Sequence, residues 1–374
     1  MNRAAPFSFY EFFAGGGMAR LGLGEAWTCL FANDFDPLKA RTYRENFPDA
    51  QEHLREGDVW AIAPADLPGR ADLAWASSPC QDFSLAGGRA GLQGGKSSAF
   101  FGFWRLMESL DVDGRAPGVL VVENVSGLLT SNRGQDFEAL CRVLTERGYR
   151  VGALEVDATT FTPQSRPRIF VIAARTPAEH LVGPSPFQTE AVRNAYDRLP
   201  KALKEAWAWW AAPAPPARNA DLASILEPDG AVVWRKEADT AALLALMAPL
   251  HLARVQAAQA EGERAVGAVF RRMRGGVQRA EVRFDGVAGC LRTPRGGSSR
   301  QTVLVIDKGQ VRSRLLTARE AARLMGLPEE YRLPKSQSGG LHVMGDGVAV
   351  PVVRWLAEHL LEPLAAGPIA AAAE

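Results

Sequence analysis

Cys80 stands where a catalytic nucleophile could act. It lies in the string Ser-Pro-Cys-Gln-Asp-Phe-Ser, directly after an apolar run, Leu73–Ala76, that is typical of a buried strand. Open α/β sheets bind their ligands at the carboxyl ends of strands. A glycine-rich, cationic segment follows at 87–96, which is typical of a loop that closes over a substrate. A thiol in such surroundings becomes a nucleophile when cations or a helix N-terminus lower its pKa.

Three further charged residues lie at the ends of predicted strands. Glu123 directly follows the apolar run Val119–Val122, and Arg166 and Arg168 lie at the start of another run. Glu123 is a candidate to hold a base, and the alternative is a salt-bridged acid at a strand end. Two arginines at alternate positions can present their guanidinium groups to a carboxylate and a phosphate.

A glycine-rich turn and two acids indicate a nucleoside-containing cofactor. The string Phe13-Ala14-Gly15-Gly16-Gly17 follows one predicted strand, and glycines let a backbone turn sharply and approach a ligand closely, although a plain tight turn is the alternative. Asp34 comes 19 residues after Gly15 and could accept hydrogen bonds from both ribose hydroxyls. Asp58 ends a third segment and could receive an adenine amino group. This turn does not resemble a GxxxxGK[ST] phosphate-binding loop. The pattern therefore suits S-adenosylmethionine, which has no phosphate groups, at least as well as NAD.

A strand and helix framework must bring these residues together. Apolar runs predict strands over 7–13, 27–32, 119–122 and 168–174. The segment 135–147 places apolar residues at i, i+3, i+4 and i+7, and a glycine follows it, so a helix is predicted there. Alternating strands and helices predict an α/β fold with a mainly parallel sheet and right-handed crossovers.

The alternating pattern breaks after Arg175. Residues 176–216 are rich in Pro, Ala and Trp and end in a proline-rich string that is typical of a linker or loop. We therefore expect a first domain over 1–180, a smaller domain over 181–300 and a return to the first domain over 301–374, with the final helix packing on the N-terminal sheet. Three tryptophans are expected in the core of the smaller domain: Trp207, Trp209 and Trp210.

The composition of the 374 residues is that of an ordinary globular protein, with 47% hydrophobic and 23% charged residues. No apolar run approaches the roughly 20 residues that span a bilayer, and the N-terminus lacks the apolar stretch of a signal peptide. The four cysteines form no CxxC pair, so no metal site is indicated and a cytoplasmic setting is expected. Three of them are expected to be inert: Cys29, Cys141 and Cys290.

Positive charge is concentrated in one stretch of a chain whose net charge is only +1. Between Arg271 and Arg314 there are eleven Arg or Lys residues and three acidic ones. Such a stretch is the electrostatic footprint expected for binding a polyanion. A solvated basic face without a partner is the alternative.

Six motifs together resemble those of the prokaryotic DNA (cytosine-5) methyltransferases. In chain order they are Phe13–Gly17, Pro79-Cys80-Gln81 with Phe83-Ser84, Glu123-Asn124-Val125, Gln164-x-Arg166-x-Arg168, Arg319–Pro328 and Gly345–Val350. The resemblance covers the chain except about 180–290, where this family keeps its variable target-recognition domain. It implies a Rossmann-like catalytic domain with a mainly parallel sheet that uses S-adenosylmethionine, plus a smaller target-recognition domain.

The resemblance also implies a mechanism. Cys80 would attack carbon 6 of a cytosine flipped out of duplex DNA. Glu123 would hold nitrogen 3 and the amino group, Arg168 would orient the base and Glu123, and Arg166 would hold the active-site backbone. The methyl group of S-adenosylmethionine would move to carbon 5, and loss of the carbon-5 proton would release Cys80.

Binding residues and partners follow from the same resemblance. The implied cofactor contacts are Phe13, Ala14, Gly15, Gly17, Asp34, Phe35, Asp58, Val59, Pro79, Asp346 and Gly347. The expected DNA contacts are Gln81, Ser84, Arg89, Gln164, Arg271, Arg272, Arg274 and Arg295. Double-stranded DNA is the expected partner of a monomeric enzyme, and a cognate restriction endonuclease is a further candidate partner.

The sequence departs from the family pattern at two acids. Asp34 stands where the family usually has Glu, and Asp346 stands where Asn is typical. The added charge at Asp346 would weaken cofactor binding unless a cation neutralises it. Neither departure removes a catalytic group, so activity is expected. The alternatives are an RNA cytosine-5 methyltransferase, a catalytically silent DNA-binding relative and an unrelated nucleotide-dependent oxidoreductase.

Overall fold

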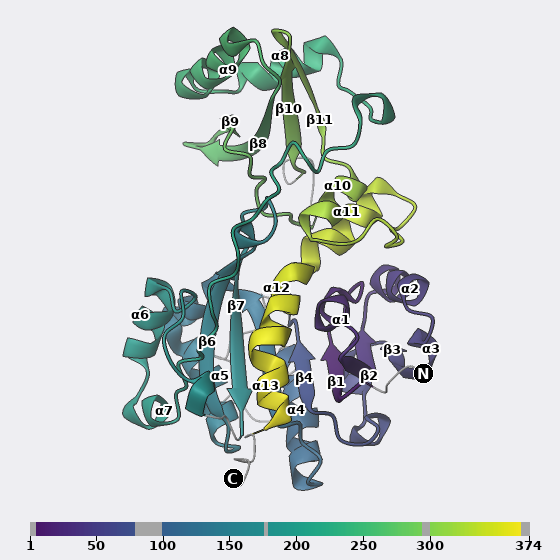
Figure 1. The fold of residues 1–374 in the computed structure, drawn as a ribbon, viewed down its shortest axis with the longest axis vertical. Helices are drawn as coiled ribbons and strands as arrows, with labels where there is room; N and C mark the ends of the chain where they lie inside the picture. The colour runs from purple at the N-terminus through teal and green to yellow at the C-terminus, as the bar shows by residue number, and fades with distance from the viewer. Residues whose placement is uncertain (1–4, 79–98, 176–178, 294–299, 368–374) are drawn as a thin grey trace, which may run out of the picture. The chain divides into compact units, whose positions relative to one another are not determined.

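The computed structural model describes residues 5–78, 99–175, 179–293 and 300–367 (Figure 1). Six of the predicted site residues lie outside the described residues: Pro79, Cys80, Gln81, Ser84, Arg89 and Arg295. Within the described part, no helix combines the length and apolar character needed to cross a membrane.

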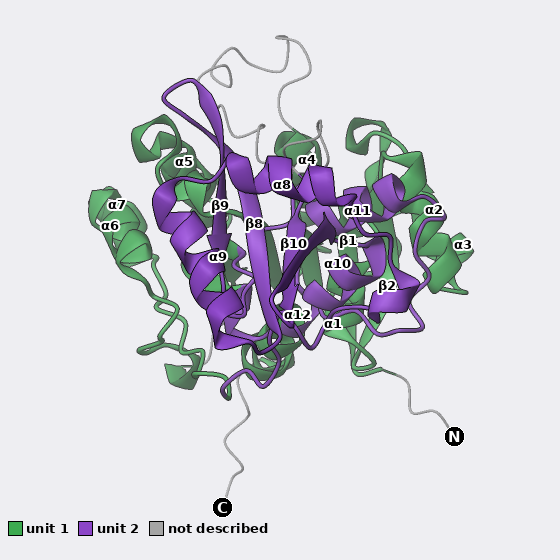
Figure 2. Cartoon of the chain, turned by 90° about the horizontal axis from the view of Figure 1, so that it is seen from above, with its two compact units in different colours: residues 1–157, 167–216, 352–374 green, residues 158–166, 217–351 purple. Residues whose placement is uncertain are grey.

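The chain divides into two compact units (Figure 2). Unit 1 takes in the described residues of 1–157, 167–216 and 352–374, and unit 2 takes in those of 158–166 and 217–351. These bounds differ from the predicted domains, because 181–216 belong to unit 1 and 301–351 belong to unit 2.

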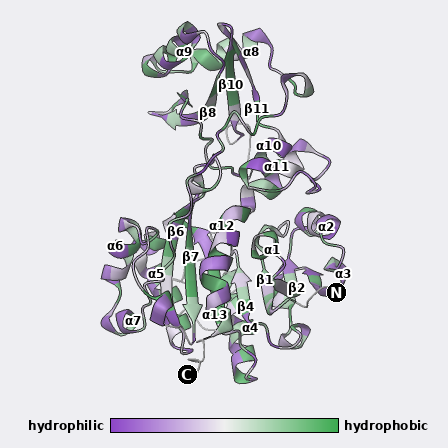
Figure 3. Cartoon of the chain, viewed as in Figure 1, coloured by the Kyte–Doolittle hydropathy of each residue, from purple (hydrophilic) through white to green (hydrophobic). Residues whose placement is uncertain are grey.

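Unit 1 is built on a seven-stranded sheet in the order β3-β2-β1-β4-β5-β7-β6. Its strands are β1 (Phe7–Phe12), β2 (Trp27–Asp34), β3 (Leu54–Glu56), β4 (Leu73–Ala76), β5 (Val119–Val125), β6 (Arg150–Asp157) and β7 (Pro167–Ala174). The pairs from β3 to β5 are parallel, and β7 runs antiparallel to both of its neighbours. The predicted mainly parallel sheet is therefore confirmed, and Figure 3 shows the apolar colouring that follows β7.

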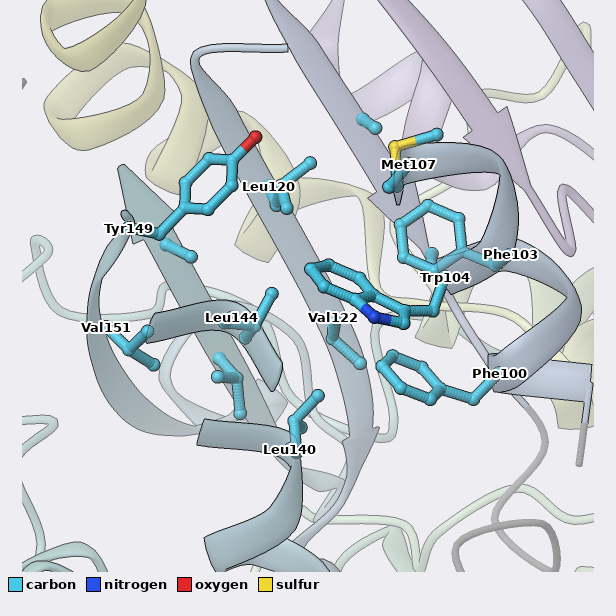
Figure 4. Close-up of a cluster of buried hydrophobic side chains, with 14 of the residues drawn as sticks. Phe100, Phe103, Trp104, Met107, Leu120, Val122, Leu140, Leu144, Tyr149 and Val151 are labelled. Carbon is cyan, nitrogen blue, oxygen red and sulfur yellow. The ribbon is translucent and has the colours of Figure 1, made fainter. Parts of the chain in front are cut away.

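Helices cover both faces of this sheet. Those of unit 1 are α1 (Met18–Leu23), α2 (Pro37–Asn46), α3 (Ala50–His53), α4 (Ala99–Val112), α5 (Gln135–Thr145), α6 (Glu190–Arg198), α7 (Lys201–Glu205), the end of α12 (Val350–Leu356) and α13 (Glu362–Ala366). The four apolar positions that predicted a helix over 135–147 are all buried in α5. They pack with aromatic residues of α4 and apolar residues of β5 in one core cluster (Figure 4).

The tryptophan cluster belongs to unit 1, so its prediction as the core of the smaller domain is wrong. Trp207 lies in the same core cluster as α4 and α5. The Trp210 indole nitrogen donates to the backbone oxygen of Ile172 in β7 at 3.0 Å. Gly152 of β6 makes this packing possible, because a Cβ atom there would lie 1.9 Å from the Ala208 carbonyl oxygen.

Unit 2 contains an antiparallel sheet in the order β11-β10-β8-β9. Its elements are α8 (Glu237–Ala245), α9 (Pro249–Glu261), β8 (Ala265–Arg274), β9 (Val277–Arg283), β10 (Thr302–Asp307), β11 (Gln310–Leu315), α10 (Ala318–Leu324) and α11 (Gln337–Asp346). Because β10 pairs with β8, the chain stays in this unit well beyond residue 300.

The chain re-enters unit 1 at Val352. Arg354 of α12 donates from Nη1 to the backbone oxygen of Leu23, the last residue of α1, at 2.9 Å. Its guanidinium group occupies the space beside Gly24, where a Cβ atom would lie 1.6 Å from Nη2. The C-terminal helix thereby fixes the end of the helix that follows the glycine turn.

Candidate active site

The glycine turn connects β1 to α1 and leaves open space on one side. Its residues Phe13, Gly15 and Gly17 have φ values of 59°, 57° and 81°, a region that favours glycine. A Cβ atom on Gly15 would meet nothing within 4 Å, whereas one on Gly17 would lie 2.2 Å from the Phe47 ring. Gly17 therefore serves packing, and the space beside Gly15 is available to a ligand.

Asp34 fastens this turn to the end of β2. Its two carboxylate oxygens accept hydrogen bonds from the backbone N–H groups of Gly15, at 2.7 Å, and Asp36, at 2.9 Å. The carboxyl group is buried, and burial raises its pKa. The neighbouring Phe35 side chain is 67% exposed, which is unusual for a phenylalanine and leaves its ring open to stack on a ligand.

Asp58 reaches the same edge of the sheet from the end of β3. The Asn33 side chain donates to the backbone oxygens of Arg55 and Gly57, at 2.9 and 3.0 Å, and so holds this segment against β2. The Asp58 carboxylate accepts from the backbone N–H of Trp60 at 3.0 Å and caps the short helix Val59–Ala61. The structure therefore brings the glycine turn, Asp34 and Asp58 to one edge of unit 1.

Glu11 is a buried acid that the sequence analysis missed. It lies in β1, is 1% exposed, and neither carboxylate oxygen has a hydrogen-bond partner within the described residues. Burial, opposed by the charge of Arg20, raises the pKa of Glu11 to about 8. The signal available in the sequence was a single acid within the otherwise uncharged run Phe7–Phe12.

A cluster centred on Arg20 supports the turn from α1. Arg20 donates to both carboxylate oxygens of Asp49 and lies over the Phe47 ring, which fills the space at Gly17. Its Nη1 also lies 2.9 Å from His53 Nε2. Because a guanidinium group can only donate, His53 accepts this bond and must be neutral.

Acid should therefore weaken unit 1 through His53. Burial and then the charge of Arg20 lower the pKa of His53, so below the unfolded-state value of about 6.5 the unfolded chain binds a proton that the folded chain excludes. Full stability is present above that pH, and it falls as the pH drops. We expect His53→Gln, which keeps an acceptor, to reduce this loss by about 1 kcal/mol between pH 7 and 5.5. Urea unfolding measures it, and exposed His180→Gln is the control; an unchanged loss in His53→Gln would contradict the assignment.

Glu123 and Arg168 form an ion pair where β5 ends and β7 begins. Arg168 Nε lies 3.1 Å from Glu123 Oε1, and both side chains are largely buried. The antiparallel pairing of β5 with β7 places Val125 opposite Arg168, so both residues reach the sheet edge that carries the glycine turn. Asn124 donates to the backbone oxygen of Ser78 at 2.9 Å, which fixes the chain two residues before Cys80.

Arg166 and Gln164 are buried inside unit 2. Arg166 is 1% exposed and donates to the backbone oxygens of Leu291, Gly345 and Gly347 at 2.9, 2.9 and 2.6 Å. Gln164 is 0% exposed. Its side-chain amide nitrogen donates to the backbone oxygen of Leu324, and its amide oxygen accepts from the backbone N–H of Leu291. The prediction that Gln164 contacts DNA is therefore wrong, because its side chain is committed to the interior.

Asp346 lies at the end of α11, near a threonine hydroxyl and an imidazole ring. It accepts a hydrogen bond from the Thr293 hydroxyl, and its other oxygen lies 3.7 Å from Nε2 of His342, one helical turn earlier. Gly347 directly follows, and its backbone oxygen accepts from Arg166.

The basic stretch from Arg271 to Arg314 includes an exposed β-hairpin and an arginine that forms a buried ion pair. The hairpin of β8 and β9 turns at two glycines and carries exposed Arg272 and Arg274 near its tip, both close to Glu281. Arg271 is half-buried. Arg314 is 1% exposed and makes a bidentate pair with buried Glu320, so it does not contribute to a polyanion-binding face.

Comparison with known proteins places this arrangement in a family. The chain is 26% identical to the type II methyltransferase M1.ScrFI of Lactococcus lactis subsp. cremoris, over 97% of this chain and 80% of that protein. It is also 26% identical to the type II methyltransferase M.HpaII of Haemophilus parainfluenzae, over 97% and 91%. The fold is similar to that of S. pombe Dnmt2 methyltransferase, with a TM-score of 0.59 and 18% identity over 96% of this chain and 99% of that one. The family model for C-5 cytosine-specific DNA methylase matches residues 7–362, so the chain belongs to this family.

Proposed function

We propose that this DNA cytosine-5 methyltransferase acts on a flipped-out cytosine in a short duplex sequence, through a covalent adduct with Cys80. The observation that carries the proposal is the buried ion pair of Glu123 and Arg168, at the sheet edge that also holds the glycine turn. A carboxyl group fixed by an arginine is held in a set orientation, in which one oxygen accepts from the cytosine amino group and the other shares a proton with nitrogen 3.

The residues at this edge fit S-adenosylmethionine, the methyl donor that the family implies. The space beside Gly15 admits a ligand, the exposed Phe35 ring offers a stacking surface, and Asp34 and Asp58 offer carboxylate oxygens. When bound, this cofactor supplies an electrophilic methyl group.

The protein side chains have separate roles in the proposed reaction. Cys80, which lies outside the described residues, adds to carbon 6 and makes carbon 5 nucleophilic. Glu123 stabilises the charge that develops on the ring, and Arg168 holds Glu123 in position. Removal of the carbon-5 proton then allows elimination of the cysteine thiolate.

A transfer assay with labelled methyl groups tests this function. Purified protein is incubated with labelled S-adenosylmethionine and either unmethylated duplex DNA or tRNA, and the digested bases are identified. Label in 5-methylcytosine from duplex DNA supports the proposal. Label only in tRNA would favour the RNA alternative, and label in neither would contradict both.

We propose that the β8–β9 hairpin binds the DNA. A two-stranded antiparallel ribbon fits the major groove, and the pairing places Arg272 opposite Arg279 and Arg274 opposite Val277 on one face. Arg272 and Arg274 are more than half exposed, as residues that contact phosphates must be.

Salt dependence tests the hairpin. Log affinity falls linearly with log salt, and each lost phosphate contact makes this fall less steep by about 0.9. We therefore expect the double variant Arg272→Gln, Arg274→Gln to show a fall that is less steep by about 2. The same variant should bind the duplex several-fold more weakly at low salt. Fluorescence anisotropy across a salt series measures it, and exposed Lys201→Gln in unit 1 is the control. Equal slopes for the double variant and the unaltered protein would remove the hairpin from the DNA face.

The biological setting proposed is modification of DNA by a monomer alongside a cognate restriction endonuclease. The support is the type II naming of the related methyltransferases. Because a type II methyltransferase protects its target sequence, DNA modified by this protein should resist one endonuclease that cleaves the same unmodified sequence.

A further inference from the structure

Arg235 and Arg271 bring two positive charges together on one face of the sheet in unit 2. Nη2 of Arg235 donates to Oγ1 of Thr302, the first residue of β10, at 3.3 Å. Thr302 pairs with Val269 of β8, and Arg271 is two residues further along that strand. Because side chains alternate along a strand and paired residues share a face, Arg271 lies on the face that carries Thr302. The two arginines are therefore neighbours.

The segment that carries Arg235 is held in place independently of its charge. The backbone N–H of Arg235 donates to the backbone oxygen of Ser313 in β11 at 2.9 Å. The preceding Trp234 has the Arg312 guanidinium group over its ring, 4.2 Å from the centroid. Its indole nitrogen donates to the backbone oxygen of Asp229 at 3.1 Å. A side chain on a segment fixed in this way loses less conformational freedom when it binds a ligand.

The charge of Arg235 has no close counter-charge in the part of the chain that the structure describes. Its side chain makes a hydrogen bond to a hydroxyl group and no salt bridge there. Burial, and then the charge of Arg271, lower the pKa of Arg235, and the attraction of Asp239 in α8 opposes this effect more weakly. Both arginines are half-buried. Like charges in partly desolvated positions repel strongly, so this place favours an anion.

We propose that Arg235 and Arg271 together bind one backbone phosphate of the DNA substrate. The inference rests on the proposed function, because it takes duplex DNA as the substrate. A phosphodiester group carries one negative charge and two free oxygens, to which guanidinium groups donate charge-assisted hydrogen bonds. Strand alternation puts Arg272 and Arg274 on the opposite face of the β8–β9 hairpin, so they contact other phosphates. A ribbon in the major groove lies between two DNA backbones, and each face of the hairpin approaches one of them.

The salt dependence of duplex binding tests whether the two arginines share a phosphate. Because one contact is lost, the double variant Arg235→Gln, Arg271→Gln should show a fall of log affinity with log salt that is less steep by about 0.9. It should also bind several-fold more weakly at low salt. Fluorescence anisotropy with the full chain measures both effects. Arg264→Gln is the matched control and should behave as the unaltered protein, because Arg264 precedes the opposite end of β8 and pairs with Asp229.

Arg235→Lys separates the effect of charge from that of shape. Lysine keeps the positive charge, so the salt dependence should match that of the unaltered protein. An ammonium group cannot make the bidentate contact of a guanidinium group, so the affinity at low salt should fall a few-fold. A fall that is less steep in Arg235→Lys as well would mean that the substitution disturbs the fold around β11, and it would contradict a direct phosphate contact.

Inorganic phosphate probes the same site without DNA. At equal ionic strength, sodium phosphate should raise the Tm of the unaltered full chain by about 2 °C more than sodium chloride does. The corresponding rise in Arg235→Gln should be less than half as large. Equal rises in the two proteins would overturn the site, because phosphate would then act elsewhere.

Three results of the DNA experiment overturn the proposal in different ways. An unchanged salt dependence in a double variant that still binds the duplex would remove both arginines from the DNA face. If inorganic phosphate still protects through Arg235 in that case, the site holds a free phosphate ion and not DNA. A fall that is less steep by about 2 would mean two separate phosphates. Absence of duplex binding by the unaltered protein would instead contradict the proposed function.

Discussion

Replacing Cys80 with alanine is expected to abolish methyl transfer, lowering kcat by about 10⁴-fold or more. Without a thiolate at carbon 6, the aromatic ring keeps its electrons and carbon 5 is not nucleophilic enough to take a methyl group. The hairpin arginines and the glycine turn are untouched, so affinity for duplex DNA and for the cofactor should stay within a few-fold. Methyl transfer to duplex DNA under single-turnover conditions measures the first effect, and anisotropy and calorimetry measure the others.

The control for this change is Cys290→Ser, which alters a half-buried cysteine without a proposed chemical role. It should leave kcat within a few-fold of the unaltered protein. Turnover by Cys80→Ala above about a hundredth of the normal rate would contradict nucleophilic catalysis by this residue.

Replacing Glu123 with glutamine is expected to lower kcat by about 10²- to 10³-fold. Glutamine keeps the shape of the side chain but cannot share a proton with nitrogen 3, so the negative charge that thiolate addition places on the ring is less well neutralised. It also leaves Arg168 without its ionic partner at 3.1 Å. Because the interaction strengthens as charge develops, kcat should fall more than KM rises.

Glu155→Gln is the matched control for this second change. Glu155 is a half-buried acid of β6 that accepts a hydrogen bond from Thr189 at 2.6 Å, outside the candidate site. Its replacement should leave kcat unchanged within about twofold. A rise in KM with kcat unchanged in Glu123→Gln would mean that the residue only binds the base. Values of kcat and KM equal to those of the unaltered protein would remove it from the mechanism.

The framework of the site could be predicted because local sequence determines it. The strands β1, β2 and β5 coincide closely with apolar runs, and α5 buries the face that its periodicity predicted. The glycine turn and Asp34 lie where their spacing from these strands placed them, and Asp34 does contact Gly15.

Features that depend on contacts between residues far apart in the sequence could not be predicted in the same way. The return of the chain was expected at 301, but pairing of β10 with β8 keeps 301–351 in unit 2. The tryptophans are held by β6 and β7 through Gly152 and Ile172, a contact that no local pattern records. Gln164 was predicted to contact DNA as part of a motif. In the structure its side-chain amide forms hydrogen bonds with residues more than a hundred positions away in the chain.

Glu11 shows why burial is hard to predict from composition. A glutamate in a strand usually faces solvent, because charged side chains are almost never fully buried without a partner. Here both faces of the central strand are covered, so alternation offers no exposed side. Only the structure shows that this acid is enclosed and that, among the residues that the structure describes, its carboxyl oxygens have no hydrogen-bond partner.

Methylation of DNA cytosine through Cys80 is best tested by expressing the protein in a host that lacks cytosine methylation and sequencing the host's DNA by conversion of unmodified cytosine. We expect carbon-5 methylcytosine at one short recurring sequence, and none when Cys80→Ala is expressed at the same level. DNA with no methylated cytosine, from cells whose purified protein is folded and binds S-adenosylmethionine, would contradict it.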